Sequence, residues 1–190
     1  MILYIDACVR KDSRTKMVAD CLLHTLDEPY ETLKLPECDF PAVDEDFLAE
    51  RDRLVSEGAL SDPVLKYAVQ FAKADAVVIA APCWDLSFPS LLKVYLEQIN
   101  VTGVTFFYTP EGIPQGLCKA EKLYYVTTVG GEFFPEQFGF GYVEALAQNF
   151  YGIRDVELIK AMGLDIIGAP VEKILQDCRE DIVRRFRKDS

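Results

Sequence analysis

An uninterrupted apolar run in the middle of the chain constrains the fold more than any other feature. Residues 76–81 read Ala-Val-Val-Ile-Ala-Ala, with no polar residue in alternation. A strand of this kind is buried on both faces, so it belongs to a parallel sheet that helices cover on both sides. A short aromatic loop, 82–89, and a helical stretch, 90–100, follow it. Open α/β sheets bind ligands at the carboxyl ends of such strands, so this loop is the first candidate for function.

Strands alternate with amphipathic helices along the rest of the chain. Apolar spacing and turn residues predict further strands at 3–7, 30–35, 122–128 and 155–161, and helices at 14–26, 43–56, 62–73, 142–151 and 170–187. Ser13 stands at the N-cap position of its helix, and Ser61 or Asp62 caps the helix at 62–73. The alternation predicts a doubly wound α/β fold with a five-stranded parallel sheet in flavodoxin order, a three-layer α/β/α sandwich.

Length and charge narrow the class of protein. The chain has 190 residues, half of them hydrophobic, which suits one domain spanning 1–190 with a hairpin-like excursion at about 103–118. A formal net charge of -11 argues against nucleic acid and anionic membrane surfaces as partners. No apolar run approaches the roughly 20 residues of a membrane span, and the first residues lack a basic leader. We expect a cytoplasmic protein.

Metal chemistry has little support in the sequence. The six cysteines are scattered without a C-x-x-C pair, and His24 is the only histidine. Zinc and iron-sulfur sites are therefore poor interpretations. His24 falls off the apolar face of its helix and is expected to be exposed. We expect no metal.

Three loops follow predicted strands, at 7–15, 82–88 and 127–132, and should converge on one crevice. Four basic residues lie at 10–16, where the first loop ends and a helix starts, together with the hydroxyls of Ser13 and Thr15 and free backbone amides. These features favour a bound phosphate, although a well-capped solvated helix start explains them equally well. A GxGxxG fingerprint and a P-loop are both absent, which disfavours Rossmann-type NAD binding and nucleoside triphosphates.

The other two loops suit a flat ring. Trp84 offers an aromatic face, although an aromatic residue at a strand end is more often part of the core. Gly130 and Gly131 let the backbone approach a ligand, although two glycines also form a simple tight turn. A phosphate site, a planar ring and a glycine wall together fit flavin mononucleotide, FMN.

Several motifs carry a resemblance to a known family along almost the whole chain. Residues 82–89 resemble the Pro-Met-Tyr-Asn-Phe-x-Ile-Pro segment of FMN-dependent NADH:quinone oxidoreductases of the azoreductase type. Residues 103–109 followed by Gly116 and Leu117 look like that family's Gly-Val-Thr-Phe-x-Tyr-Thr excursion, and residues 128–131 lie where it has Ser-Arg-Gly-Gly. Residues 13–15 are similar to its phosphate-binding Ser-x-Ser, and 150–153 to its Phe-x-Gly-Ile.

The resemblance implies a cofactor site and a mechanism. The implied FMN contacts are Ser13, Arg14 and Thr15 for the phosphate, Cys83, Trp84, Asp85 and Leu86 along the ring, and Thr128, Val129, Gly130 and Gly131 on its other side. The family's homodimers have the flavin at the interface, which suggests Tyr108 and Phe150 as substrate-side aromatics. Two departures stand out: Asp85 replaces an amide with a carboxylate, and Val129 replaces an arginine.

The leading functional hypothesis is an enzyme that takes hydride from NADH or NADPH onto FMN and passes two electrons to a quinone or azo acceptor in a ping-pong cycle. Since the flavin carries the chemistry, no catalytic side chain is expected. Two alternatives remain open. One is an FMN-binding electron carrier without nicotinamide turnover, and the other is a flavin-free structural or regulatory relative.

Overall fold

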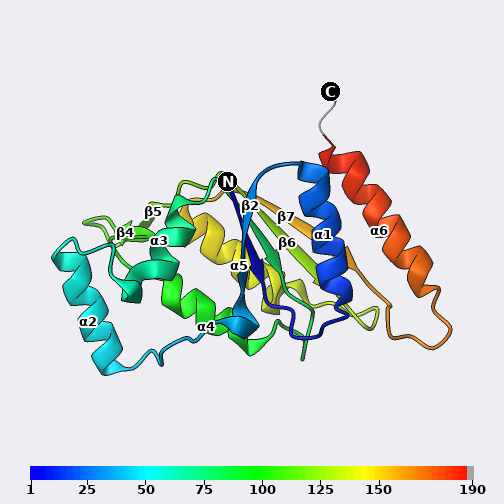
Figure 1. Cartoon of the computed structure of the whole chain (residues 1–190), viewed down its shortest axis with the longest axis horizontal. Helices are drawn as coiled ribbons and strands as arrows, with labels where there is room; N and C mark the ends of the chain where they lie inside the picture. Colours follow the sequence, from blue (N-terminus) through cyan, green and yellow to red (C-terminus); the bar gives the residue numbers. More distant parts are fainter. Residues whose placement is uncertain (188–190) are drawn as a thin grey trace.

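Five parallel strands form the central sheet of the protein. A computed structural model describes residues 1–187. The sheet strands are β1 (Ile2–Asp6), β2 (Tyr30–Lys34), β3 (Ala76–Ala80), β6 (Lys122–Thr128) and β7 (Asp155–Ala161). They lie in the order β2-β1-β3-β6-β7, and every neighbouring pair is parallel (Figure 1). The predicted strand order and the predicted three-layer fold are confirmed.

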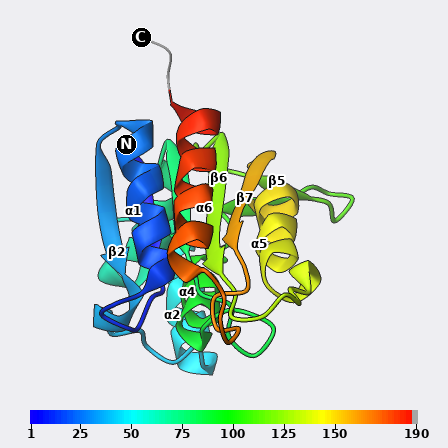
Figure 2. The same cartoon turned by 90° about the vertical axis from the view of Figure 1, so that its right-hand side faces the viewer.

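Helices cover both faces of the sheet. The helices α1 (Arg14–Leu26) and α6 (Val171–Phe186) lie side by side on one face, as Figure 2 shows. The helices α3 (Lys66–Lys73), α4 (Ser90–Ile99) and α5 (Phe140–Leu146) lie on the other face (Figure 1).

The central strand explains why its sequence shows no polar alternation. Val77 and Ile79 of β3 belong to the core beneath α3, α4 and α5, whereas Val78 and Ala80 belong to the core beneath α1 and α6. All four side chains are at most 1% exposed. Both faces of β3 are therefore buried, as the apolar run predicts.

A small outlying unit extends beyond α3 and α4. It contains α2 (Glu45–Ser56) and the antiparallel hairpin of β4 (Phe106–Tyr108) and β5 (Pro114–Gly116). Leu54 of α2 packs against α3 and residues 101–104 in a separate hydrophobic cluster.

Several predicted bounds shift by one or two residues, and three elements differ from the prediction for reasons that the local structure explains. The segment 62–73 begins as a 3-10 turn, Pro63–Leu65, and becomes α-helical only at α3, because the Asp62 side chain accepts a hydrogen bond from Val64 N and closes a tighter turn. The predicted helix 142–151 starts at Phe140 as α5 and continues as a π-helical turn, Ala147–Tyr151, which Gly152 ends at a φ of 80°. The strand β2 stops at Lys34, since Pro36 initiates a 3-10 turn.

Candidate functional site

The carboxyl ends of the parallel strands enclose a cavity of about 300 Å³. The loops after β1, β3 and β6 line it as expected, and the loop after β7 adds a fourth wall. Backbone bonds hold these loops in register: Cys83 N donates to Thr128 O at 3.0 Å, and Val129 N donates to Ala161 O at 2.9 Å. The predicted site residues that line this cavity are Ser13, Arg14, Thr15, Cys83, Trp84, Thr128, Val129 and Gly130.

The first turn of α1 forms the polar end of the cavity. Ser13 caps the helix, and its Oγ accepts a hydrogen bond from Lys16 N at 3.2 Å. The buried Thr15 hydroxyl lies 2.6 Å from that of Thr128 and ties the helix start to the end of β6. The amides of a first helical turn lack intrahelical acceptors, so this end of the cavity offers donors and a positive dipole to an anion.

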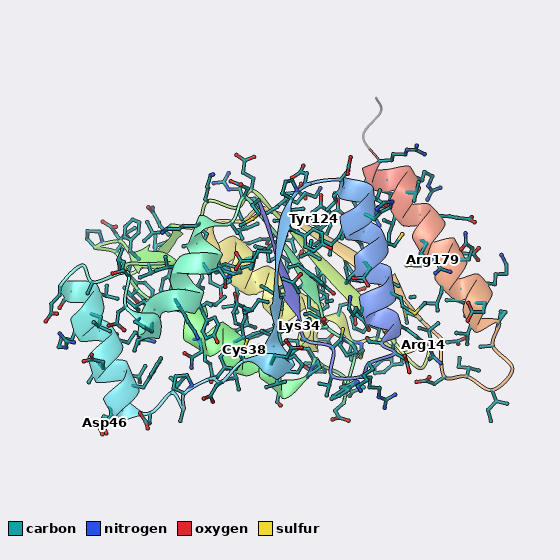
Figure 3. All side chains as sticks on the ribbon, viewed as in Figure 1. Arg14, Lys34, Cys38, Asp46, Tyr124 and Arg179 are labelled. Atoms are coloured by element: carbon teal, nitrogen blue, oxygen red, sulfur yellow. The ribbon has the colours of Figure 1, made fainter. Side chains whose placement is uncertain are left out.

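Arg14 makes a connection that the sequence did not reveal. Its guanidinium donates to Leu164 O at 3.0 Å and pairs with the Asp165 carboxylate at 2.7 Å. Figure 3 shows Arg14 at the end of α1 that lies beside the loop leading into α6. Leu164 and Asp165 line the cavity, yet we did not predict them. The available signal was the carboxyl end of a fourth parallel strand, followed by Gly163.

The aromatic loop forms a two-residue turn. Trp84 N donates to Ser87 O at 3.0 Å, and Ser87 N donates to Trp84 O at 2.8 Å. Asp85 and Leu86 occupy the two central positions with φ values of 50° and 68°. This turn places Trp84 in the cavity wall, 36% exposed, whereas Asp85 and Leu86 project outside the lining.

The thiols near the cavity are held in the neutral form. Burial raises the pKa of the Cys83 thiol, and the negative charge of Asp85 adds to the effect. Burial also raises the pKa of Cys8, at the end of β1, to about 12. A neutral thiol is a poor nucleophile, so neither cysteine is activated for covalent catalysis.

Of the two glycines predicted to contact the ligand, Gly130 lines the cavity and Gly131 does not. A Cβ on Gly130 would overlap the Asp165 carboxylate as it is placed here, so a larger residue would require that side chain to move. Gly131 is exposed and lies outside the lining. Val129 is 4% exposed, so it faces the interior and presents little side chain to the cavity.

The two predicted substrate-side aromatics lie away from the cavity. Tyr108 of β4 and Phe150 of the π-helical turn both pack against Phe106, with ring centroids 5.4 and 4.6 Å from it. Neither lines the cavity within this chain. Their assignment stays a prediction that requires a second copy of the chain.

In residues 1–187, no group of three or more His, Cys, Asp or Glu side chains could hold a metal ion. Over the same described range, no helix has the length and apolar character needed to cross a membrane. His24 is exposed, as expected.

Known proteins match this chain over almost its whole length. A family model described as flavodoxin-like fold matches residues 1–186. An FMN-dependent NADH:quinone oxidoreductase from Lachnoclostridium phytofermentans is 36% identical over 94% of this chain and 94% of its own. One with the same name from Clostridium perfringens is 34% identical over 98% of both chains. The chain therefore belongs to the flavodoxin-like fold family and, within it, to the FMN-dependent NADH:quinone oxidoreductases.

Solved structures agree with the fold. An azoreductase from Bacillus anthracis superposes with a TM-score of 0.83 at 24% identity, covering 99% of both chains. An FMN-dependent NADH-azoreductase from Bacillus anthracis, solved in complex with FMN, has a TM-score of 0.79 at 21% identity and covers 98% of this chain and 99% of its own.

Proposed function

We propose that this protein is an FMN-dependent oxidoreductase that transfers two electrons from NADH to a quinone or an azo compound. The observation that carries the proposal is the cavity at the carboxyl ends of β1, β3 and β6, in a chain 36% identical to a named FMN-dependent NADH:quinone oxidoreductase over 94% of both lengths. With a quinone, the balanced reaction consumes NADH, a proton and the quinone, and yields NAD⁺ and the hydroquinone.

The residues of the cavity fit FMN. The first-turn amides of α1 and the Ser13 hydroxyl suit the phosphate, because a helix start favours an anion. Trp84 and the backbone of residues 83–84 suit one edge of the flavin ring. Gly130 also lines the cavity, and the Asp165 carboxylate occupies the space that a Cβ at this position would take.

The chemistry that FMN supplies when bound is the uptake of hydride from NADH and the later release of two electrons to the acceptor, which corresponds to a ping-pong cycle. The protein's own part is to bind and orient. This division of labour agrees with a site that holds neutral thiols and contains no histidine.

We also propose a homodimer in which Tyr108 and Phe150 of one copy lie near the cavity of the other. Phe107, Tyr108, Ile113 and Leu117 of the hairpin region are 37–59% exposed, and this apolar surface supports the proposal. Light scattering of the purified protein tests it. A monomer at micromolar concentration contradicts the dimer. A dimer in which Tyr108→Ala leaves the Michaelis constant for the quinone unchanged contradicts the role of Tyr108.

The compartment that we propose is the cytoplasm. All six cysteines are free, which suits a reducing environment.

Steady-state oxidation of NADH with a small quinone tests the enzymatic proposal. The purified protein is loaded with FMN, freed of excess cofactor and assayed with menadione, with the unloaded protein as control. We expect turnover that depends on FMN and gives parallel double-reciprocal plots. Bound FMN without turnover would indicate an electron carrier, and failure to retain FMN would indicate a flavin-free relative.

A further inference from the structure

The Arg14–Asp165 ion pair is the strongest feature of the cavity that the proposed function leaves unexplained. Arg14 is the first residue of α1, where the phosphate of a flavin is proposed to bind. Its guanidinium is already engaged by the Asp165 carboxylate at 2.7 Å and by Leu164 O at 3.0 Å. The cation nearest the anion site is therefore neutralised by a carboxylate of the same chain.

The backbone fixes the position of Asp165. Its amide donates to Gly130 O at 2.8 Å, and the neighbouring amides of Leu164 and Gly163 donate to Val129 O at 3.2 Å and Gly131 O at 2.8 Å. The loop after β7 is thereby held against the loop after β6. The carboxylate lies over the Cα of Gly130, where any larger residue would overlap it.

The formal charges around the cavity are balanced. Two arginines, Arg10 and Arg14, and two aspartates, Asp12 and Asp165, line it. Without the carboxylate of Asp165, the same lining would carry one net positive charge. An anionic ligand therefore meets a weaker attraction than the two arginines alone would provide.

The pair is open to competition from a stronger anion. The Arg14 side chain is 40% exposed and that of Asp165 is 72% exposed, so water screens their attraction and can solvate the carboxylate when the pair separates. A phosphate monoester carries more charge than a carboxylate and forms strong bidentate bonds with a guanidinium.

We propose that Asp165 competes with the phosphate of the flavin for the Arg14 guanidinium, and so lowers the preference of the site for phosphorylated over unphosphorylated flavin. This inference rests on the proposed function, because it assigns the FMN phosphate to the start of α1. Asp165 acts through Arg14 and is a specificity-determining residue. It has no part in the transfer of electrons.

The test is a pair of binding titrations read by flavin fluorescence. The dissociation constants of FMN and riboflavin are measured at low ionic strength for the wild-type chain and for Asp165→Asn, which keeps the shape of the side chain. We expect FMN to bind about two- to fivefold more tightly to the variant, the range of a released surface ion pair. Riboflavin should change less than twofold, since it has no phosphate.

Two further variants separate the local pair from general charge. Asp177→Asn removes the same charge from α6, where Asp177 pairs with Lys173 away from the cavity, and should leave both affinities unchanged. In an Arg14→Gln background, Asp165→Asn should no longer tighten FMN. An equal gain in that background would overturn the proposal, because Asp165 would then act by direct repulsion.

The remaining outcomes are also decisive. Unchanged or weaker binding of FMN to Asp165→Asn, or an equal gain for riboflavin, overturns the competition. A wild-type chain that binds neither flavin contradicts the proposed function and leaves the competition to be tested with inorganic phosphate alone. Phosphate should then raise the melting temperature of Asp165→Asn more than that of the wild type, and an equal rise overturns the inference.

Discussion

Asp85 and Leu86 hold a backbone conformation that neither residue prefers. Their φ values of 50° and 68° lie in the left-handed region, which costs roughly 1–2 kcal/mol for a residue with a Cβ. The turn they form is closed by two hydrogen bonds between Trp84 and Ser87, and Ser87 Oγ donates to Phe138 O at 2.5 Å. This strain is retained beside the candidate site, where it fixes the position of Trp84.

Leu86→Gly should stabilise the protein. Glycine adopts a positive φ without strain, and Leu86 is 49% exposed, so little buried surface is lost. After the entropic cost of glycine, we expect a gain of about 0.5–1 kcal/mol in the free energy of unfolding, measured by urea denaturation. Leu117→Gly is the control: Leu117 is 44% exposed without a positive φ, and its replacement should destabilise. A loss of stability in Leu86→Gly would contradict the strain.

Asp85→Asn should raise the reduction potential of bound FMN. The charge of Asp85 reaches the cavity wall, since it contributes to the raised pKa of Cys83. A nearby negative charge disfavours the anionic reduced flavin, so its removal should favour reduction. A spectroelectrochemical titration measures the change, and Asp85→Glu should keep the wild-type potential. Equal potentials in the wild type and Asp85→Asn would show that the carboxylate does not act on the flavin.

At the scale of elements, the contact between β5 and the π-helical turn supports the outlying hairpin. Gly116 of β5 lies directly against the backbone of Tyr151 and Gly152. Phe106 of β4 adds a ring contact with Phe150, and the Tyr151 hydroxyl donates a hydrogen bond to Asn100 Oδ1 at 2.7 Å. The hairpin is thus joined to the main body through a glycine contact and aromatic packing.

Gly116→Ala should destabilise the protein by about 1–3 kcal/mol, the usual cost of forcing an extra methyl group into a packed site. Its Cβ would overlap the Tyr151 carbonyl, which cannot move without distorting the turn. Gly131→Ala is the matched control, since its Cβ would have no neighbour closer than 3.9 Å. Urea unfolding of both variants provides the measurement, and equal stabilities would contradict the close contact.

The sequence predicted elements with strong periodicity and missed features set by long-range contacts. The strand 76–81 and its neighbours were predictable, because their apolar runs directly reflect burial on both faces. The π-helical turn at 147–151 has no periodic signal of its own. Asp165 was missed since its role depends on Arg14, 151 positions earlier in the chain. The loops after β1, β3 and β6 were found because strand ends are visible in the sequence.

At the scale of the whole molecule, three cysteine thiols make the stability of the fold sensitive to alkaline pH. Burial raises the pKa of Cys8 and of Cys118 to about 12 and that of Cys178 to about 11, from 9.0. In the unfolded chain these thiols lose their protons first, so the folded state binds more protons above pH 9. The contribution of these protonated thiols to the free energy of unfolding is therefore complete below pH 9, and it is lost as the pH rises towards 12.

The unfolding free energy should therefore decrease from pH 9 to pH 11, and the decrease should be shallower in a Cys8→Ala, Cys118→Ala variant. The two proteins are compared by the slope of the unfolding free energy against pH and not by its absolute value, since the substitutions also change packing. Urea denaturation at a series of pH values gives both slopes. Identical slopes would contradict the contribution of these thiols.

Anaerobic mixing of the FMN-loaded protein with NADH tests the central claim most directly, because it separates the two half-reactions. We predict that the flavin absorbance near 450 nm bleaches on addition of NADH and returns on addition of a quinone without oxygen. Flavin that stays oxidised with excess NADH would contradict the account of this protein as an FMN-dependent NADH:quinone oxidoreductase.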